Sequence, residues 1–126
     1  MKLESQVVSL DLAKRLKELG VKQESVFQWV LLGGHNPPVV RYEYGSAYHA
    51  LVEASAFTVA ELGEILPLDV YTVKDKKGFY CWSDREWTNE EGLFDDHLDP
   101  IHADTEADAR AKILIYLLEN KLVTCG

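Results

Sequence analysis

The chain has 126 residues, of which 47% are hydrophobic and 27% are charged, and its formal net charge is −8. This length is usual for one domain of roughly 100–150 residues, and the composition is typical of a soluble globular fold. The longest apolar run, "ILIYLL", is far shorter than the roughly 20 residues that a membrane-spanning helix needs. The start, "MKLESQVVSLDL", lacks the apolar core of a signal peptide. We therefore expect one soluble, cytoplasmic domain over residues 1–126, with no membrane segment.

The negative charge is concentrated in one stretch. Residues 84–108 contain ten acidic residues and one basic residue, a net charge of −9, whereas the remainder contains 11 acidic and 12 basic residues, a net charge of +1. A stretch of this charge repels the phosphate backbone of nucleic acids and attracts basic surfaces. Direct nucleic-acid binding is therefore not expected, and a basic protein partner is.

The amino-terminal stretch "SLDLAKRLKELG" predicts a short amphipathic helix. Ser9 suits the N-cap position, and Gly20 suits the position just after the helix. Leu12, Leu16 and Leu19 recur at helical spacing, so they define the buried side of this helix.

The stretches "VFQWVLL" and "VVRYEY" predict an antiparallel hairpin over residues 26–44. The first is rich in β-branched and aromatic residues, and the second alternates along its length. The intervening "GGHNPP" contains residues that interrupt strand pairing. Trp29, inside the first strand, is expected in the core. Residues 45–56 fit either a short helix or an irregular crossover.

The second half opens with the clearest helix start in the sequence, "FTVAELGEILP". Thr58 and Glu61 are spaced as a capping box, and Pro67 ends the helix. The stretch "DVYTVKDKKGFYCWSD" then predicts a second hairpin, with strands at about 70–74 and 78–82 and a turn through "DKKG".

Residues 84–104 follow as an acidic segment with weak periodicity, which we expect to be largely irregular. Thr105 then caps a long terminal helix whose apolar residues extend around most of its circumference. Such a helix is either central in its own domain or shared with a partner, and the second alternative predicts a homodimer through it. The elements together predict an α+β fold, with three helices on one antiparallel sheet of about four strands, in chain order α-β-β-α-β-β-α.

Three stretches carry a resemblance: "VSLDLAKRLKELGVKQESVF", "FTVAELGEILP" and "HADTEADARAKILIYLLENKL". They resemble a family of short uncharacterised proteins of phages, prophages and bacterial genomes, which have similar capped helices at the start, centre and end. The matching stretches cover about half of the chain. The resemblance implies a bacterial or phage origin and a compact α+β fold. It transfers no functional residue, because the family has no established activity.

The stretch "DDHLDPIHAD", residues 95–104, contains candidate metal ligands in His97, Asp99 and His102. Their spacing matches neither a zinc signature nor a calcium-binding loop. We therefore expect an exposed loop before the last helix, with no metal and no cofactor.

No residue is assigned a catalytic role, since the sequence contains neither a nucleophile elbow nor a phosphate-binding loop. Cys81 lies in a strand-like run and is expected to be a buried structural cysteine. The penultimate residue, Cys125, is not expected to pair with it. In "WSDREW", Trp82 and Trp87 suit either interface anchors or core residues that seal one end of a sheet, and the second interpretation is favoured.

The leading hypothesis is a non-enzymatic accessory or interaction protein of phage or prophage type that uses an acidic surface. The alternative is a small-molecule-binding or enzymatic domain whose pocket contains histidine. The residues predicted to contact the partner are Trp87, Glu90, Glu91, Phe94, Asp95, Asp96 and Asp99.

Overall fold

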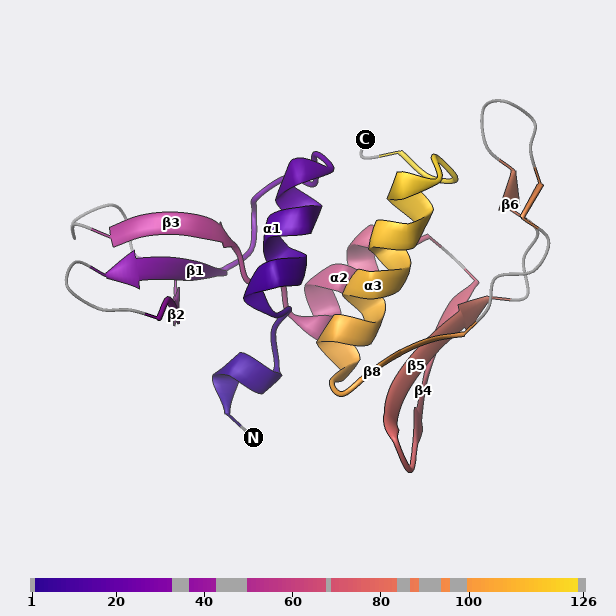
Figure 1. Cartoon of the computed structure of the whole chain (residues 1–126), viewed down its shortest axis with the longest axis horizontal. Coiled ribbons are helices and arrows are strands. Elements are labelled where there is room, and N and C mark those ends of the chain that lie inside the picture. The colour runs from indigo at the N-terminus through magenta and orange to yellow at the C-terminus, as the bar shows by residue number, and fades with distance from the viewer. Residues whose placement is uncertain are drawn as a thin grey trace.

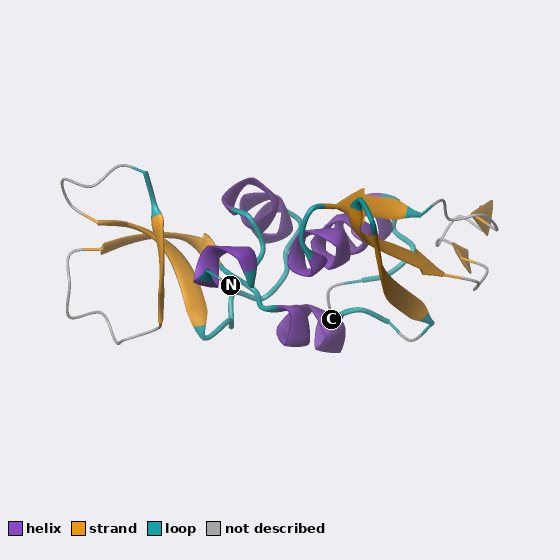
Figure 2. Cartoon of the chain, turned by 90° about the horizontal axis from the view of Figure 1, so that it is seen from below, coloured by secondary structure: helices purple, strands orange, loops and turns teal. Residues whose placement is uncertain are grey.

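The computed structural model describes residues 2–32, 37–42, 50–67, 69–83, 87–88, 94–95 and 100–124. Its elements are η1 (Leu3–Ser5), α1 (Leu10–Glu18), β1 (Phe27–Leu32), β2 (Val39–Tyr42), β3 (Ala50–Ser55), α2 (Val59–Ile65), β4 (Val70–Asp75), β5 (Gly78–Ser83), β6 (Trp87–Thr88), β7 (Phe94–Asp95), β8 (Ile101–Ala103) and α3 (Glu106–Glu119). The α-helices lie in the middle of the molecule, between a sheet of β2, β1 and β3 and a sheet of β4, β5 and β8 (Figures 1 and 2).

The α+β class, the α-helices and both predicted hairpins are confirmed, but the single four-stranded sheet is wrong. The described strands form two antiparallel three-stranded sheets, in the orders β2-β1-β3 and β4-β5-β8, and a two-stranded ribbon of β6 and β7. Each hairpin therefore gains a third strand, since an isolated two-stranded hairpin is only marginally stable in water. The helices between the two hairpins prevent them from joining into one sheet (Figure 1).

Both third strands come from stretches that the sequence did not identify as strands. Within residues 45–56, expected to be a helix or a crossover, β3 pairs with β1 and the register shifts between Trp29 and Val30. Within the acidic segment, expected to be irregular and to end as an exposed loop, β8 pairs with β5. Both pairings are non-local, so the flanking sequence contains no turn signal that would reveal them.

The helix starts confirm two of the three predicted N-caps. Thr58 and Glu61 form the capping box of α2, with the Glu61 N–H 3.2 Å from Thr58 Oγ1 and the Thr58 N–H 2.9 Å from Glu61 Oε1. At the start of α3, the Thr105 hydroxyl accepts a hydrogen bond from the Asp108 N–H at 3.2 Å. Ser9 is the N-cap of α1, but its side chain makes no capping bond.

A contact between distant residues fixes the start of α1 instead. The Ser9 N–H donates a hydrogen bond of 2.7 Å to Asp108 Oδ1. Asp108 lies in the first turn of α3, so this bond joins the N-cap of α1 to α3, between two residues that are 99 positions apart in sequence. The sequence predicts that Asp108 lies in the first turn of the last helix, but it does not predict its bond with Ser9.

The terminal helix α3 is the centre of the fold. One side, with Ala107, Ala111 and Leu114, packs against α1 and α2. Another side, with Ile113 and Leu117, packs against the β4-β5-β8 sheet around Cys81. The helix is therefore apolar on most sides because elements of the same chain cover it, which is the first of the two alternatives predicted for it. These residues give a homodimer no support.

Trp29 confirms the expected core position. It packs against two of the buried clusters, and its Nε1–H donates a hydrogen bond of 2.8 Å to the Val8 carbonyl. This bond satisfies the polar atom of an otherwise apolar side chain. None of the helices in the described part of the chain has the length and hydrophobicity needed to cross a membrane.

Candidate functional site

The residues predicted to bind a partner are only partly within the described chain. Trp87, Phe94 and Asp95 belong to the β6–β7 ribbon, in which Trp87 pairs with Asp95 and Thr88 with Phe94. The ribbon lies at the end of the molecule that is farthest from the β2-β1-β3 sheet (Figure 1). The other predicted contacts lie outside the described residues: Glu90, Glu91, Asp96 and Asp99.

The carboxylates at the carboxyl-terminal end of the acidic stretch stabilise the fold. Asp108 accepts the bond from Ser9, and Glu106 Oε2 lies 3.2 Å from Arg110 Nη2 one helical turn away. Both acids are also favourably placed in the first turn of α3, where the helix dipole is positive. The remaining negative charge of the stretch belongs to residues 84–104, which are joined to the ends of β5 and α3.

The β4-β5-β8 sheet has two chemically different faces. Directly paired residues of an antiparallel sheet point to the same side. Phe79, Cys81, Ile101 and Ala103 therefore share the side that packs against α3. The opposite side, which we call the outer aromatic face, is formed by Tyr71, Tyr80, Trp82 and His102.

The rings of the outer aromatic face form two cross-strand pairs. Tyr71 and Trp82 have ring centroids 5.0 Å apart, and Tyr80 and His102 have centroids 5.1 Å apart, each pair with an interplanar angle of 36°. Tyr71 is 43% exposed, and the His102 side chain is 56% exposed. Two separate ring pairs therefore lie on the same face of three adjacent strands.

Trp82 corrects the prediction of a core residue. It is only partly buried and belongs to none of the buried clusters. The residue before it, Cys81, takes the core position, since side chains alternate between the faces of a strand. The turn "DKKG" fixes the register of the hairpin and therefore already implied that Tyr71 and Trp82 share a face. Only the packing of α3 shows which face is covered.

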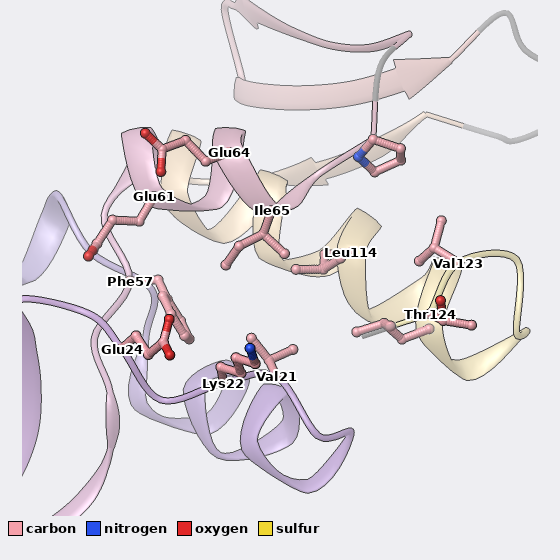
Figure 3. Close-up of a pocket in the computed structure, with 12 residues that line it drawn as sticks. Val21, Lys22, Glu24, Phe57, Glu61, Glu64, Ile65, Leu114, Val123 and Thr124 are labelled. Carbon is pink, nitrogen blue, oxygen red and sulfur yellow. The ribbon is translucent and has the colours of Figure 1, made fainter. Parts of the chain in front are cut away.

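A separate cavity of about 420 Å³ lies between α2, the end of α3 and the stretch 21–24 (Figure 3). Figure 3 shows Ile65 of α2 and Leu114 of α3 on one side, with Val21 and Phe57 on the other. Polar and apolar surface contribute about equally to the cavity walls, and the charged residues among those that line it come from α2 and the 21–24 stretch: Lys22, Glu24, Glu61 and Glu64.

Glu61 at this margin is a structural carboxylate. Its Oε1 accepts hydrogen bonds from Ser25 Oγ at 2.7 Å and from the Thr58 N–H at 2.9 Å. Its Oε2 accepts from the Val26 N–H at 3.1 Å. The carboxylate therefore joins the start of α2 to the residues that precede β1, and its acceptor sites are largely occupied.

His102, the histidine that the structure describes, lies away from the cavity beside α2. His102 lines a shallow hollow of about 370 Å³ with Lys77, Asp104 and Lys112, and its Nε2 is 3.8 Å from Asp75 Oδ2. Among the residues that the structure describes, those that line the cavity beside α2 include no histidine. Within the described ranges, no three His, Cys, Asp or Glu side chains gather as metal ligands. His97 and Asp99 lie outside those ranges.

Cys81 is the buried structural cysteine that the sequence predicts. It is fully buried, and its Sγ lies 3.4 Å from Thr72 Oγ1 on the neighbouring strand. Burial raises the pKa of the Cys81 thiol, and the hydrogen bond with Thr72 offsets only part of this rise. The thiol therefore stays protonated near neutral pH and is a poor nucleophile.

No family model, curated protein or solved structure matches the chain.

Proposed function

We propose that the chain is a non-enzymatic protein-interaction domain, of phage or prophage accessory type, that binds a basic partner in the bacterial cytoplasm. The observation that carries this proposal is the separation of charge, −9 in residues 84–108 against +1 in the remainder. A concentrated field of one sign attracts an oppositely charged protein and accelerates its association.

The positions of the flanking residues support the proposal. Strand β5 ends at Ser83 and β8 begins at Ile101, and the two strands are paired at Cys81 and Ile101. The acidic residues between these two strands therefore leave and rejoin the sheet at the same end, whereas Asp104, which follows β8, lies at the other end, near Gly78. The acids that stabilise the fold, Glu106 and Asp108, lie beyond the segment.

Capture from a bacterial lysate tests this function with three forms of the chain. The first is the wild type, and the second neutralises five acids of the segment: Glu90→Gln, Glu91→Gln, Asp95→Asn, Asp96→Asn and Asp99→Asn. The third is a charge-matched control with five exposed acids changed elsewhere: Glu4→Gln, Asp11→Asn, Glu18→Gln, Asp69→Asn and Asp75→Asn. Circular dichroism must show that all three are folded.

The wild type and the control should capture the same basic protein, and the neutralised variant should not. Raising the salt concentration should weaken capture, because the attraction is screened. Equal capture by all three forms, or capture of no basic protein, would contradict the proposed function.

A second candidate function, binding of a small molecule, is favoured by the cavity beside α2. Its volume of about 420 Å³ falls within the roughly 300–1,000 Å³ of ligand pockets. An apolar fluorescent probe should bind the wild type, and Ile65→Trp, which fills the cavity, should exclude the probe. Equal fluorescence from both forms would rule this candidate out.

A further inference from the structure

The cavity beside α2 combines apolar surface with an unequal set of charges. Its charged lining residues are three glutamates, Glu24, Glu61 and Glu64, and one lysine, Lys22. With the carboxylates ionised and the amine protonated near neutral pH, the described lining has one positive charge and three negative charges. A cleft lined by an excess of one sign attracts ligands of the opposite sign.

The apolar part of the lining remains accessible to a ligand. Ile65 of α2 is 39% exposed although it is a large hydrophobic residue, and it lines the cavity together with Leu114 and Val21 (Figure 3). Removing such surface from water is favourable in proportion to the apolar area that is covered. A ligand for this cavity therefore needs an apolar body as well as a charged group.

The carboxylates of the lining differ in what they already bind. Glu61 accepts hydrogen bonds from Ser25, Val26 and Thr58. Within the described part of the chain, the side chains of Glu24 and Lys22 form no ion pair and no hydrogen bond. Figure 3 shows both of them extending from the 21–24 stretch, across the cavity from Ile65. Glu24 is therefore a carboxylate with acceptor sites open to a ligand.

The stretch that carries Glu24 is fixed by its own hydrogen bonds. The Val21 N–H donates to the Leu16 carbonyl at 3.1 Å. Gln23 Nε2 donates to the Val21 carbonyl at 2.9 Å, and Gln23 Oε1 accepts from the Ser55 N–H at 2.8 Å. The backbone beside the cavity is thus attached both to α1 and to β3, and a preorganised site loses less conformational entropy when it binds.

We infer that the cavity beside α2 binds a small organic cation, with its apolar body against Ile65 and Leu114 and its ammonium group paired with Glu24. An organic anion would pair with Lys22 alone and would face three carboxylates. This inference rests on the second candidate function and specifies the chemistry of its ligand. It is independent of the acidic segment.

Three ligands with the same alkyl chain test the inference: n-octylammonium, n-octanol and n-octanoate. Titrations of the isotope-labelled full chain, followed by NMR chemical shifts, measure the dissociation constant of each. The wild type should bind the cation most tightly and the anion most weakly. Added salt should reduce the difference between the cation and the neutral alcohol, because it screens the attraction.

Two substitutions of opposite charge effect separate recognition of the ligand from general effects on folding. Glu24→Gln should weaken n-octylammonium binding roughly 2- to 5-fold, and Lys22→Gln should strengthen it by a similar factor. Both variants should bind n-octanol as the wild type does. Glu4→Gln removes an exposed carboxylate that is not among the lining residues, and it should leave all three affinities unchanged. Circular dichroism confirms that each variant is folded.

The outcomes distinguish failure of the inference from failure of the second candidate function. If Ile65→Trp abolishes binding but the wild type binds the cation no more tightly than the alcohol or the anion, the inference is overturned and small-molecule binding stands. Equal cation affinity of Glu24→Gln and the wild type also overturns the inference alone. If the wild type binds none of the three ligands, or Ile65→Trp binds them as the wild type does, both the inference and the second candidate function fail.

Discussion

The two faces of the β4-β5-β8 sheet are made by alternate residues of the same strands, yet they have different environments. Phe79 and Cys81 pack against α3, whereas Tyr80 and Trp82 lie on the outer aromatic face. Both sets are largely apolar or aromatic, so hydrophobicity alone does not separate them. The position of the covering helix, rather than the strand sequence, therefore decides which of these side chains stabilise the fold and which remain on the outside.

The largest loss of unfolding free energy is expected on the face of the sheet that packs against α3. Leu117 of α3 is fully buried against the sheet, so Leu117→Ala should lower the free energy of unfolding by about 2–5 kcal/mol. Chemical denaturation followed by circular dichroism measures this loss. Leu117→Met, which nearly preserves volume, is the control and should cost less than about 1.5 kcal/mol. Equal losses for the two variants would contradict tight packing at this position.

The turn that joins β4 to β5 provides the next test. Gly78 has a φ of 133°, and a Cβ at this position would lie 2.6 Å from the Ala103 carbonyl oxygen. Gly78→Ala should therefore cost roughly 2–3 kcal/mol, through backbone strain and displacement of β8.

Gly20→Ala is the matched control, because Gly20 has a φ of 92° but no atom within 4 Å of the added Cβ. It should cost only about 1–2 kcal/mol. If Gly20→Ala were the more damaging variant, the close packing of the turn against β8 would be refuted.

The ionisation and alkylation of the Cys81 thiol test whether α3 covers the core face of the sheet. They do so without a large change in side-chain volume. Burial raises the pKa of its thiol, so the unfolded thiol ionises first as the pH rises above its ordinary value of about 8.5. The stabilisation from keeping the thiol protonated is complete below that pH and is lost as the pH rises toward the folded-state pKa.

In a Cys125→Ser background, the unfolding free energy should therefore fall more steeply above about pH 8.5 than it does with Cys81→Ala added. Alkylation of Cys81 by a maleimide should be slow in the native state and rapid in denaturant. Rapid alkylation in the native state would show that the Cys81 thiol is accessible to solvent, which would contradict its burial against α3.

The smallest effect on stability is expected on the outer aromatic face. Tyr71 is 43% exposed and belongs to no buried cluster, so Tyr71→Leu should change the unfolding free energy by no more than about 0.5 kcal/mol. A thermal melt beside the wild type measures this difference. A loss comparable to that of Leu117→Ala would mean that both faces belong to the core.

Much of the fold follows from local signals in the sequence. The capping box of Thr58 and Glu61, the Thr105 cap and the turn before Gly78 were identified because each signal lies within a few residues of the element that it bounds. The third strands β3 and β8 were missed because their partners lie far away in the chain. The 2.7 Å bond between Ser9 and Asp108 was missed for the same reason.

The candidate surface divides in the same way. Its negative charge follows directly from the amino-acid composition. The sequence also places Tyr71 and Trp82 in a predicted hairpin. The sequence nevertheless favours a core position for Trp82, which is wrong, because an aromatic residue in a strand suits either face. Four of the predicted partner contacts lie outside the described residues, and they remain predictions: Glu90, Glu91, Asp96 and Asp99.

The amino-acid sequence alone predicts the α+β class, the helices with most of their caps, the two hairpins and the concentration of negative charge. These properties depend on residue type and on spacing along a few neighbouring residues. Three further features come from the packing of the whole chain: the hairpins belong to two separate sheets, α3 is covered on most sides by its own chain, and Trp82 lies on an outer face. Those outcomes depend on which distant surfaces exclude water from one another, and only the packed chain specifies that.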